Sequence, residues 1–280
     1  MTVTDIDRPI GVFDSGFGGL TVLRSLVEQL PNEDFIYLGD TARAPYGPRA
    51  IAEVRRFALE GLDHLVAQGV KALVIACNSA SAAVLRDARE RYDVPITEVV
   101  LPAASRAVAA TRNRRVGVVA TQSTVNSAAY EDAFAIAPHI TLTSKACPRF
   151  VEFVEAGITG GDELLAVTEE YLEPVKKAQA DTLILGCTHY PLLSGVIGYV
   201  LGNGVTLVSS AEACAQATYA TLTQAGLLRH QPREATRTFQ TTGDARDFQG
   251  IGRRLLGGFV SNATTVTISK EDGHVPEGDL

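Results

Sequence analysis

Two cysteines, Cys77 and Cys187, occupy equivalent places in two similar stretches of the 280-residue sequence. Residues 72–79 and 182–189 each run from apolar residues through the cysteine to small polar residues. The carboxyl end of a parallel strand is where an α/β sheet presents its reactive groups. A chain that carries this arrangement twice can direct two thiols at one substrate.

The four cysteines of the chain have different expected roles. A free cysteine in an apolar segment is usually a small buried hydrophobic residue, and this interpretation fits Cys147 and Cys214. Cys77 and Cys187 instead stand where a strand gives way to polar residues and the start of a helix, a setting that lowers the pKa of a thiol. Four cysteines in so long a chain do not make a disulfide framework.

A histidine, His189, follows the second of these cysteines by two positions. Cys187 and His189 together offer only two ligands and lack the Cys-x-x-Cys spacing of a zinc site, so no metal is expected. We expect His189 to be the proton partner of a thiol, with a structural histidine as the alternative.

The order of apolar and amphipathic segments predicts the fold class. Apolar runs of strand length alternate with stretches of 3.6-residue periodicity, which is typical of βα units around a parallel sheet. Ile10-Gly11-Val12 recurs as Val116-Gly117-Val118 at nearly the offset that separates the two cysteines, and this indicates a duplication. We therefore expect an α/β protein with two similar parallel-sheet lobes related by pseudo-symmetry and an active site in the cleft between them.

The same patterns predict where the chain crosses between the lobes. A turn at Val100-Leu101-Pro102 and the pair Ser209-Ser210 mark the two expected crossings. The first lobe would be discontinuous, with residues 1–99 and 210–280, and the second would comprise residues 100–209. Strands are expected near residues 10–14, 35–38, 72–76, 94–100, 116–120, 140–145, 182–186, 205–208 and 236–241. Helices are expected over residues 20–30, 51–65, 211–228 and 245–256, with a loose tail at 270–280.

Composition excludes several classes of protein. With 46% hydrophobic and 20% charged residues, the chain is not disordered. No apolar run approaches the roughly 20 residues that cross a bilayer, and residues 1–9 lack the features of a secretory signal, so we expect a cytoplasmic protein with no membrane contact. A net charge of −7 disfavours a general nucleic-acid binder. The one short basic cluster, residues 112–115, is interpreted as a solvated helix end.

A glycine-rich turn, residues 14–20, follows the first expected strand. It matches neither the dinucleotide-binding fingerprint nor a phosphate loop. The glycines permit a tight turn, and Asp14 or Ser15 can cap the following helix. Asp14 could also hold a substrate ammonium or orient the proton of a thiol.

Two further loops carry candidate binding groups. In the loop of residues 39–48, Tyr46 and the amide of Gly47 could bind a carboxylate, although Tyr46 could equally pack as a partly buried aromatic residue. After the strand near Val116, Thr121 and Thr124 are candidates either for helix caps or for hydroxyl ligands.

From about Pro9 to Gly243 the sequence resembles the cofactor-independent glutamate racemases, within the wider aspartate/glutamate racemase group. In this chain Ser79 stands where that family commonly has threonine. The segments that carry the resemblance are Asp14-Ser15-Gly16-x-Gly18-Gly19, Pro45-Tyr46-Gly47, Ala76-Cys77-Asn78-Ser79-Ala80, Glu152 within residues 148–155, and Gly186-Cys187-Thr188-His189-Tyr190-Pro191.

The resemblance implies a cytoplasmic enzyme, often a homodimer, that interconverts L- and D-glutamate without a cofactor and supplies D-glutamate for peptidoglycan. One cysteine would be the thiolate base and the other the thiol acid, since a single base would have to move across the substrate. Asp14 would support Cys77, and His189, with Glu152, would support Cys187. The implied catalytic residues are Cys77, Cys187, Asp14, His189 and Glu152, and the implied substrate contacts are Asp14, Ser15, Tyr46, Gly47, Asn78, Ser79, Thr121, Thr188 and His189.

Two other functions stay open at this point. An aspartate racemase or a related two-cysteine isomerase would differ in the amino acid whose α-proton exchanges. A protein that regulates a partner belongs to a different class, and DNA gyrase is a partner that the resemblance allows.

Overall fold

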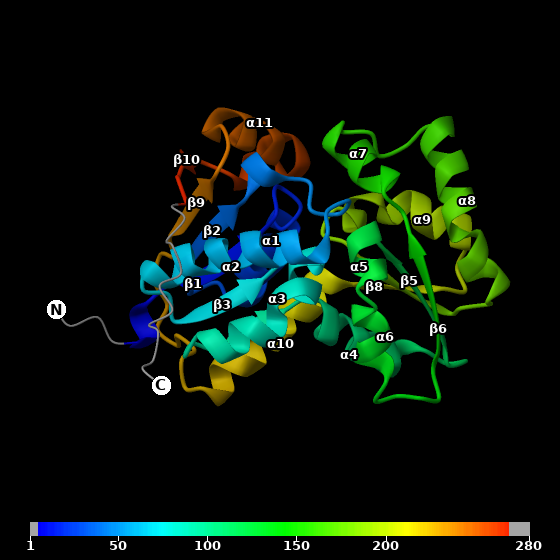
Figure 1. Ribbon diagram of the computed structural model, residues 1–280, viewed down its shortest axis with the longest axis horizontal. Coiled ribbons are helices and arrows are strands. Elements are labelled where there is room, and N and C mark those ends of the chain that lie inside the picture. The colour runs from blue at the N-terminus through cyan, green and yellow to red at the C-terminus, as the bar shows by residue number, and fades with distance from the viewer. Residues whose placement is uncertain (1–4, 269–280) are drawn as a thin grey trace, which may run out of the picture.

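The computed structural model describes residues 5–268 and contains two parallel β-sheets with helices on both faces of each (Figure 1). The first sheet has the order β10-β9-β2-β1-β3-β4, and every neighbouring pair is parallel. Its strands are β1 (Ile10–Asp14), β2 (Phe35–Gly39), β3 (Ala72–Ile75), β4 (Ile96–Glu98), β9 (Arg237–Thr241) and β10 (Thr264–Thr265).

The second sheet has the order β6-β5-β7-β8 and is also parallel throughout. Its strands are β5 (Arg115–Ala120), β6 (Thr141–Ala146), β7 (Thr182–Gly186) and β8 (Thr206–Ser209). This order repeats β2-β1-β3-β4 of the first sheet, with each strand replaced by the one four places later in the chain. The expected α/β fold with two similar parallel-sheet lobes is therefore confirmed.

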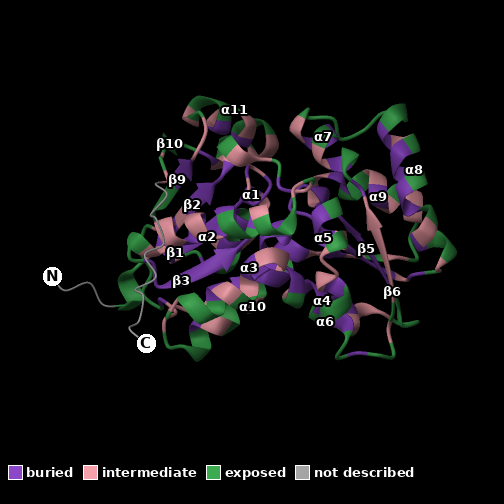
Figure 2. Cartoon of the chain, in the orientation of Figure 1, coloured by how far each residue is buried: buried purple, intermediate pink, exposed green. Residues whose placement is uncertain are grey.

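Helices cover both faces of each sheet because successive strand residues point to opposite faces. Ile10 and Val12 face a core formed with α1 and α10, whereas Phe13 faces a second core with α2 and α3. In the other lobe, α7, α8 and α9 pack on one face and α4 and α6 on the other. Figure 2 shows the resulting buried and exposed sides of these helices. The helices are α1 (Leu20–Gln29), α2 (Ile51–Ala67), α3 (Asn78–Arg91), α4 (Val100–Ala110), α5 (Gln122–Asn126), α6 (Ala129–Phe134), α7 (Arg149–Glu155), α8 (Asp162–Lys177), α9 (Ser194–Leu201), α10 (Ser210–Gln224) and α11 (Ala245–Leu256).

The segment between the two sheets differs from its prediction. Val100-Leu101-Pro102 is the start of helix α4 and not a turn, and the strand expected near 94–100 is confined to Ile96–Glu98. The buried Glu98 carboxylate accepts hydrogen bonds from the backbone amides of Val100 and Leu101, which caps the helix. Pro102 lies in the first turn, where a missing N–H is tolerated.

The last part of the described chain returns to the first sheet. Helix α10 ends at Gln224, earlier than the expected residue 228. Beyond it, the buried Glu33 carboxylate accepts a hydrogen bond from the Arg229 amide at 2.8 Å and forms an ion pair with Lys71 at 2.6 Å. These contacts hold the segment before β9 against the first lobe. The tail expected at 270–280 lies outside the described residues. Between residues 5 and 268, none of the helices has both the length and the apolar character that a membrane crossing requires.

Candidate active site

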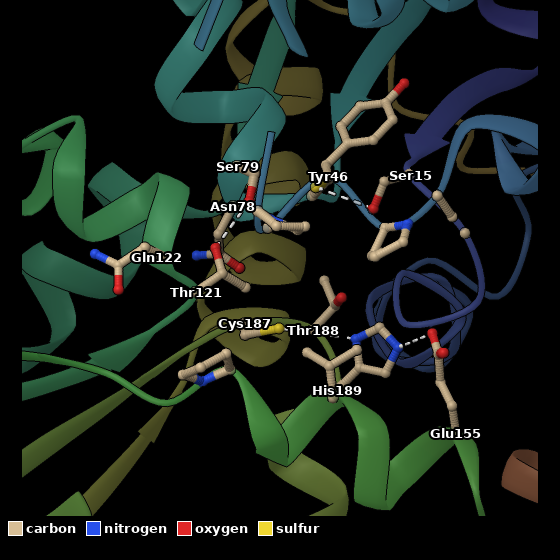
Figure 3. Close-up of a pocket in the computed structure, with 18 of the residues that line it drawn as sticks. Ser15, Tyr46, Asn78, Ser79, Thr121, Gln122, Glu155, Cys187, Thr188 and His189 are labelled. Atoms are coloured by element: carbon tan, nitrogen blue, oxygen red, sulfur yellow. Dashed lines mark hydrogen bonds and ion pairs between the residues drawn. The ribbon is translucent and has the colours of Figure 1, made fainter. Parts of the chain in front are cut away.

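The two cysteines singled out in the sequence lie on one cavity of about 210 Å³. Cys77 follows β3 and precedes the first residue of α3, and Cys187 follows β7. The other residues around the cavity come from the loops beside these strand ends and from the first turns of α3 and α5 and from helix α7, in both lobes (Figure 3). The duplicated strand ends thus bring their thiols to one site, because each carboxyl edge faces the other lobe.

Cys187 lies next to the imidazole of His189, which in turn contacts the carboxylate of Glu155. Its Sγ lies 3.7 Å from Nδ1 of His189, and Nε2 of His189 lies 3.2 Å from Oε1 of Glu155 (Figure 3). Burial alone would lower the pKa of His189, but the interactions with Cys187 and Glu155 outweigh it and raise that pKa to about 10. At neutral pH the imidazole is therefore positively charged, and this cation lies beside the sulfur of Cys187.

The carboxylate that contacts His189 is Glu155, a residue that sequence reasoning did not select. Glu152, which was selected, lies one turn earlier on the same helix, α7, and lines the cavity from an exposed position. Both glutamates belong to the segment that carried the family resemblance. Their spacing of three residues places them on neighbouring positions of one helix face, so the position of His189 is needed to choose between them.

Cys77 has a different environment. Its Sγ donates to Oγ of Ser15 at 3.4 Å. Burial, followed by the charge of Asp14, raises the pKa of Cys77 to about 12, although Ser15 and the Ala80 amide act in the opposite direction. The lowered pKa expected from the helix start is therefore wrong for this thiol, because burial outweighs the helix. Cys77 is a neutral thiol at neutral pH.

Asp14 lies beneath the cavity and not on it. Its buried carboxylate accepts hydrogen bonds from the Gly16 amide at 2.9 Å and from the Tyr37 hydroxyl at 3.3 Å. Burial raises the pKa of Asp14. Gly19 covers the side chain so closely that a Cβ there would lie 2.4 Å from Cβ of Asp14. Asp14 therefore acts on Cys77 through its charge, and the structure provides no surface on which it would touch a ligand.

Tyr46 lines the cavity with its backbone, while its phenol is turned away. The hydroxyl donates to Asp40 Oδ2 at 2.5 Å, and the ring packs between Phe13 and Phe57. Figure 3 shows the Tyr46 side chain pointing out of the site. Of the two interpretations of Tyr46, packing holds for its side chain.

Three hydroxyls connect the lobes at the side of the cavity. Ser79 Oγ lies 2.9 Å from Thr121 Oγ1 and 3.4 Å from Thr124 Oγ1, and the two threonine hydroxyls lie 3.1 Å apart. Thr121 also caps α5, which confirms the first of the two roles considered for it, and it lines the cavity. Gly47 approaches Thr121 so closely that a Cβ there would lie 3.1 Å from Cβ of Thr121.

Of the remaining predicted contacts, Asn78, Thr188 and Ser15 all line the cavity. The Thr188 carbonyl accepts a hydrogen bond of 2.9 Å from Thr21 in the first lobe. Cys147 and Cys214 are buried and do not line the cavity, as expected. Within residues 5–268 no group of three His, Cys, Asp or Glu side chains could hold a metal ion.

Comparison with known proteins gives the family. Residues 10–218 match the model of the Asp/Glu/Hydantoin racemase family. The chain belongs to that family. It is an enzyme, an isomerase, and the resemblance seen in its motifs is confirmed. It is 64% identical over 251 residues to a glutamate racemase of Parafrankia sp., with 89% of this chain and 91% of the relative covered. It is 58% identical over 250 residues to a glutamate racemase of Mycobacterium tuberculosis, with 89% and 92% covered.

Solved structures agree with this assignment. Glutamate racemase isoform RacE1 from Bacillus anthracis superposes with a TM-score of 0.89 at 39% identity, covering 93% of this chain and 97% of that one. Glutamate racemase from Francisella tularensis in complex with D-glutamate gives 0.88 at 35% identity, covering 94% and 98%. An aspartate racemase from Picrophilus torridus is only 17% identical, with a TM-score of 0.50, and shows the fold alone.

Proposed function

We propose that this enzyme is a glutamate racemase that interconverts L- and D-glutamate by a two-base mechanism. The observation that carries the proposal is the pair of thiols, Cys77 and Cys187, on one cavity between the lobes, each with a different acid-base partner. Relatives named glutamate racemase at 58–64% identity support glutamate over aspartate as the substrate.

In the L to D direction, the Cys187 thiolate removes the α-proton and the Cys77 thiol donates a proton to the opposite face. The protonation states of the site favour this start, because His189 is charged and Cys77 is neutral. The step leaves a thiol at Cys187 and a thiolate at Cys77. That product state is the starting state for D-glutamate, so reversal needs no other base.

The substrate carboxylates would be held by hydroxyls and backbone amides. In the part of the chain that the structure describes, no lysine or arginine lines the cavity, and His189 is its one basic side chain. Neutral donors bind a carboxylate without the strong ground-state attraction of a buried ion pair. The groups proposed for this role are Ser15, Ser79, Thr121, Thr188 and the backbone of Tyr46 and Gly47.

The test is proton NMR of L-glutamate in D₂O with purified, reduced enzyme and no pyridoxal phosphate, together with optical rotation. Loss of both the α-proton signal and the rotation is the expected result. Exchange of L-aspartate with no change in glutamate would overturn the proposed substrate.

The proposal extends to the setting of the enzyme. D-glutamate would be supplied to peptidoglycan synthesis by a cytoplasmic homodimer, and light scattering coupled to gel filtration tests the dimer. We also propose that the described residues divide into a first lobe of 5–99 and 210–268 and a second of 100–209. The sheet memberships of β4, β5, β8 and β9 support this division.

A further inference from the structure

Tyr130 contacts the first lobe from a helix of the second. It lies on α6, is 2% exposed and does not line the cavity. Its hydroxyl oxygen accepts a hydrogen bond of 3.0 Å from Nδ2 of Asn78, the residue that follows Cys77. This buried hydrogen bond therefore crosses from one lobe to the other directly behind the substrate cavity.

The same tyrosine also lies against the turn that carries the other cysteine. Gly186 ends β7 and precedes Cys187. A Cβ at Gly186 would lie 3.0 Å from Cε2 and 3.2 Å from the hydroxyl oxygen of Tyr130. The tyrosine ring thus occupies the space that a side chain at position 186 would take. Tyr130 touches a neighbour of each catalytic thiol.

The hydrogen bond to Tyr130 leaves the other end of the Asn78 amide unpaired. Oδ1 of Asn78 is buried and has no hydrogen-bond partner among residues 5–268, and Asn78 lines the cavity (Figure 3). A buried carbonyl oxygen without a donor is costly, and a ligand that brings a donor removes that cost. At neutral pH the hydrogen-bond donor of glutamate is its α-ammonium group.

We propose that Tyr130 is a positioning residue that fixes the Asn78 side chain so that Oδ1 accepts a hydrogen bond from the substrate ammonium. This inference rests on the proposed function, since it assigns an amino acid to the cavity. Holding the ammonium from the side of Asn78 places the α-carbon between the turns of Cys77 and Cys187. Tyr130 contacts both turns, through Asn78 and through Gly186.

The first experiment compares Tyr130→Phe with Tyr92→Phe. Tyr130→Phe keeps the ring against Gly186 and removes only the hydroxyl. We expect KM for both enantiomers to rise roughly tenfold, the size of one hydrogen bond, while kcat changes less than about threefold. Tyr92→Phe removes a hydroxyl that donates a hydrogen bond of 2.7 Å to Asp63, away from the cavity, and this variant should leave KM unchanged. An unchanged KM in Tyr130→Phe would overturn the proposal.

A double-mutant cycle separates positioning from packing. If Tyr130 acts through Asn78, adding Tyr130→Phe to Asn78→Ala changes KM by less than about twofold, because the group that it positions is already gone. Effects that multiply would show that Tyr130 acts independently of Asn78 and would overturn the proposal. Circular dichroism spectra establish that each variant is folded.

Wild-type enzyme is first assayed with both glutamate and aspartate. Turnover of aspartate alone would reject the proposed substrate, and the cycle would then be measured with aspartate, whose ammonium presents the same donor. Turnover of neither would overturn both proposals. Turnover of glutamate with multiplying effects would overturn only the role of Tyr130.

Discussion

The two thiols of this site occupy equivalent strand ends but have unequal neighbours. Cys187 lies beside the His189 imidazole, whose pKa is raised by Cys187 and by Glu155, whereas Cys77 lies beside the Ser15 hydroxyl and above the buried Asp14. A cation next to a thiol favours its anion, and burial next to a carboxylate favours its neutral form. The two thiols therefore differ in the charge beside them, a cationic imidazole at Cys187 and a buried carboxylate near Cys77.

Glu155 and Glu152 provide a matched pair of substitutions on α7. Glu155→Gln removes one of the two groups, after Cys187, that raise the pKa of His189, and we expect kcat/KM to fall roughly tenfold or more because the imidazole loses part of its charge. Glu152→Gln, which changes a carboxylate at the cavity rim, should alter kcat/KM less than about threefold. Polarimetry with L- and D-glutamate measures both. A larger loss in Glu152→Gln would contradict the assignment of Glu155.

The charge on His189 makes stability depend on pH. Its pKa rises from 6.5 to about 10 in the folded chain, so between these values the folded state binds the additional proton. Its stabilising contribution is complete below about pH 6.5 and is lost as the pH rises toward 10. The difference in free energy of unfolding between wild type and His189→Gln, measured with urea, should therefore shrink over that range. A difference independent of pH would refute the charged imidazole.

For the individual residues of the site, the sequence predicted which side chains lie at the cavity better than it predicted which side chains contact one another. Cys77, Cys187 and His189 were predictable because their chemistry follows from their places at strand ends. Glu155 was not, since Glu152 has the same side chain on the same helix face. The phenol of Tyr46 could not be placed either, because its partner, Asp40, is fixed only when the loop of residues 39–48 folds.

Among the elements, the strands were predicted well, whereas helix α4, which follows the last strand of the first sheet before the chain enters the second, was not. Buried parallel strands are continuous apolar runs, and β1, β3 and β7 lie within a residue of their expected positions. The error at Val100-Leu101-Pro102 arose because proline usually signals a turn. Here the Glu98 carboxylate caps the helix, and that contact depends on how β4 is buried.

Helix α11 contains two glycines for which opposite effects are expected. Gly250 is exposed, and a Cβ added there would have no other atom within 4 Å, so Gly250→Ala should stabilise the protein by about 0.5–1 kcal/mol through helix propensity. At Gly252 the Cβ would lie 2.8 Å from Cγ2 of Val260, so Gly252→Ala should destabilise by about 1–3 kcal/mol through overpacking. Urea denaturation measures both. Shifts of the same sign would contradict the packing of α11.

In the whole molecule, two lobes of matching strand order each supply one cysteine to the cavity. The matching strand orders β2-β1-β3-β4 and β6-β5-β7-β8 place Cys77 and Cys187 after equivalent strands, β3 and β7. The repeated motifs predicted this correspondence. Some hydrogen bonds join the two lobes, such as those of Ser79 to Thr121 and of Asn78 to Tyr130. They do not correspond to any repeated motif, so the sequence could not predict them.

Removing the thiol of either lobe should stop racemisation in both directions. Cys77→Ala and Cys187→Ala are each expected to lower the rate roughly a hundredfold or more, because each removes an acid-base group. Cys214→Ala, a buried cysteine away from the cavity, should retain activity. Circular dichroism at a glutamate-sensitive wavelength follows both directions. Near-normal racemisation by either single variant of the active-site pair would refute the two-base mechanism.

The unequal neighbours of the two thiols are also subject to a thermodynamic constraint. L- and D-glutamate are mirror images with identical free energies in water, so the equilibrium favours neither. The Haldane relation then requires the same kcat/KM in both directions, even though the two sides of the cavity, around Cys77 and around Cys187, differ. The different surroundings of Cys77 and Cys187 can therefore change kcat and KM between the two directions only together, so that kcat/KM stays equal. A substitution beside only one of the two cysteines must therefore reduce kcat/KM for L-glutamate and kcat/KM for D-glutamate by the same factor.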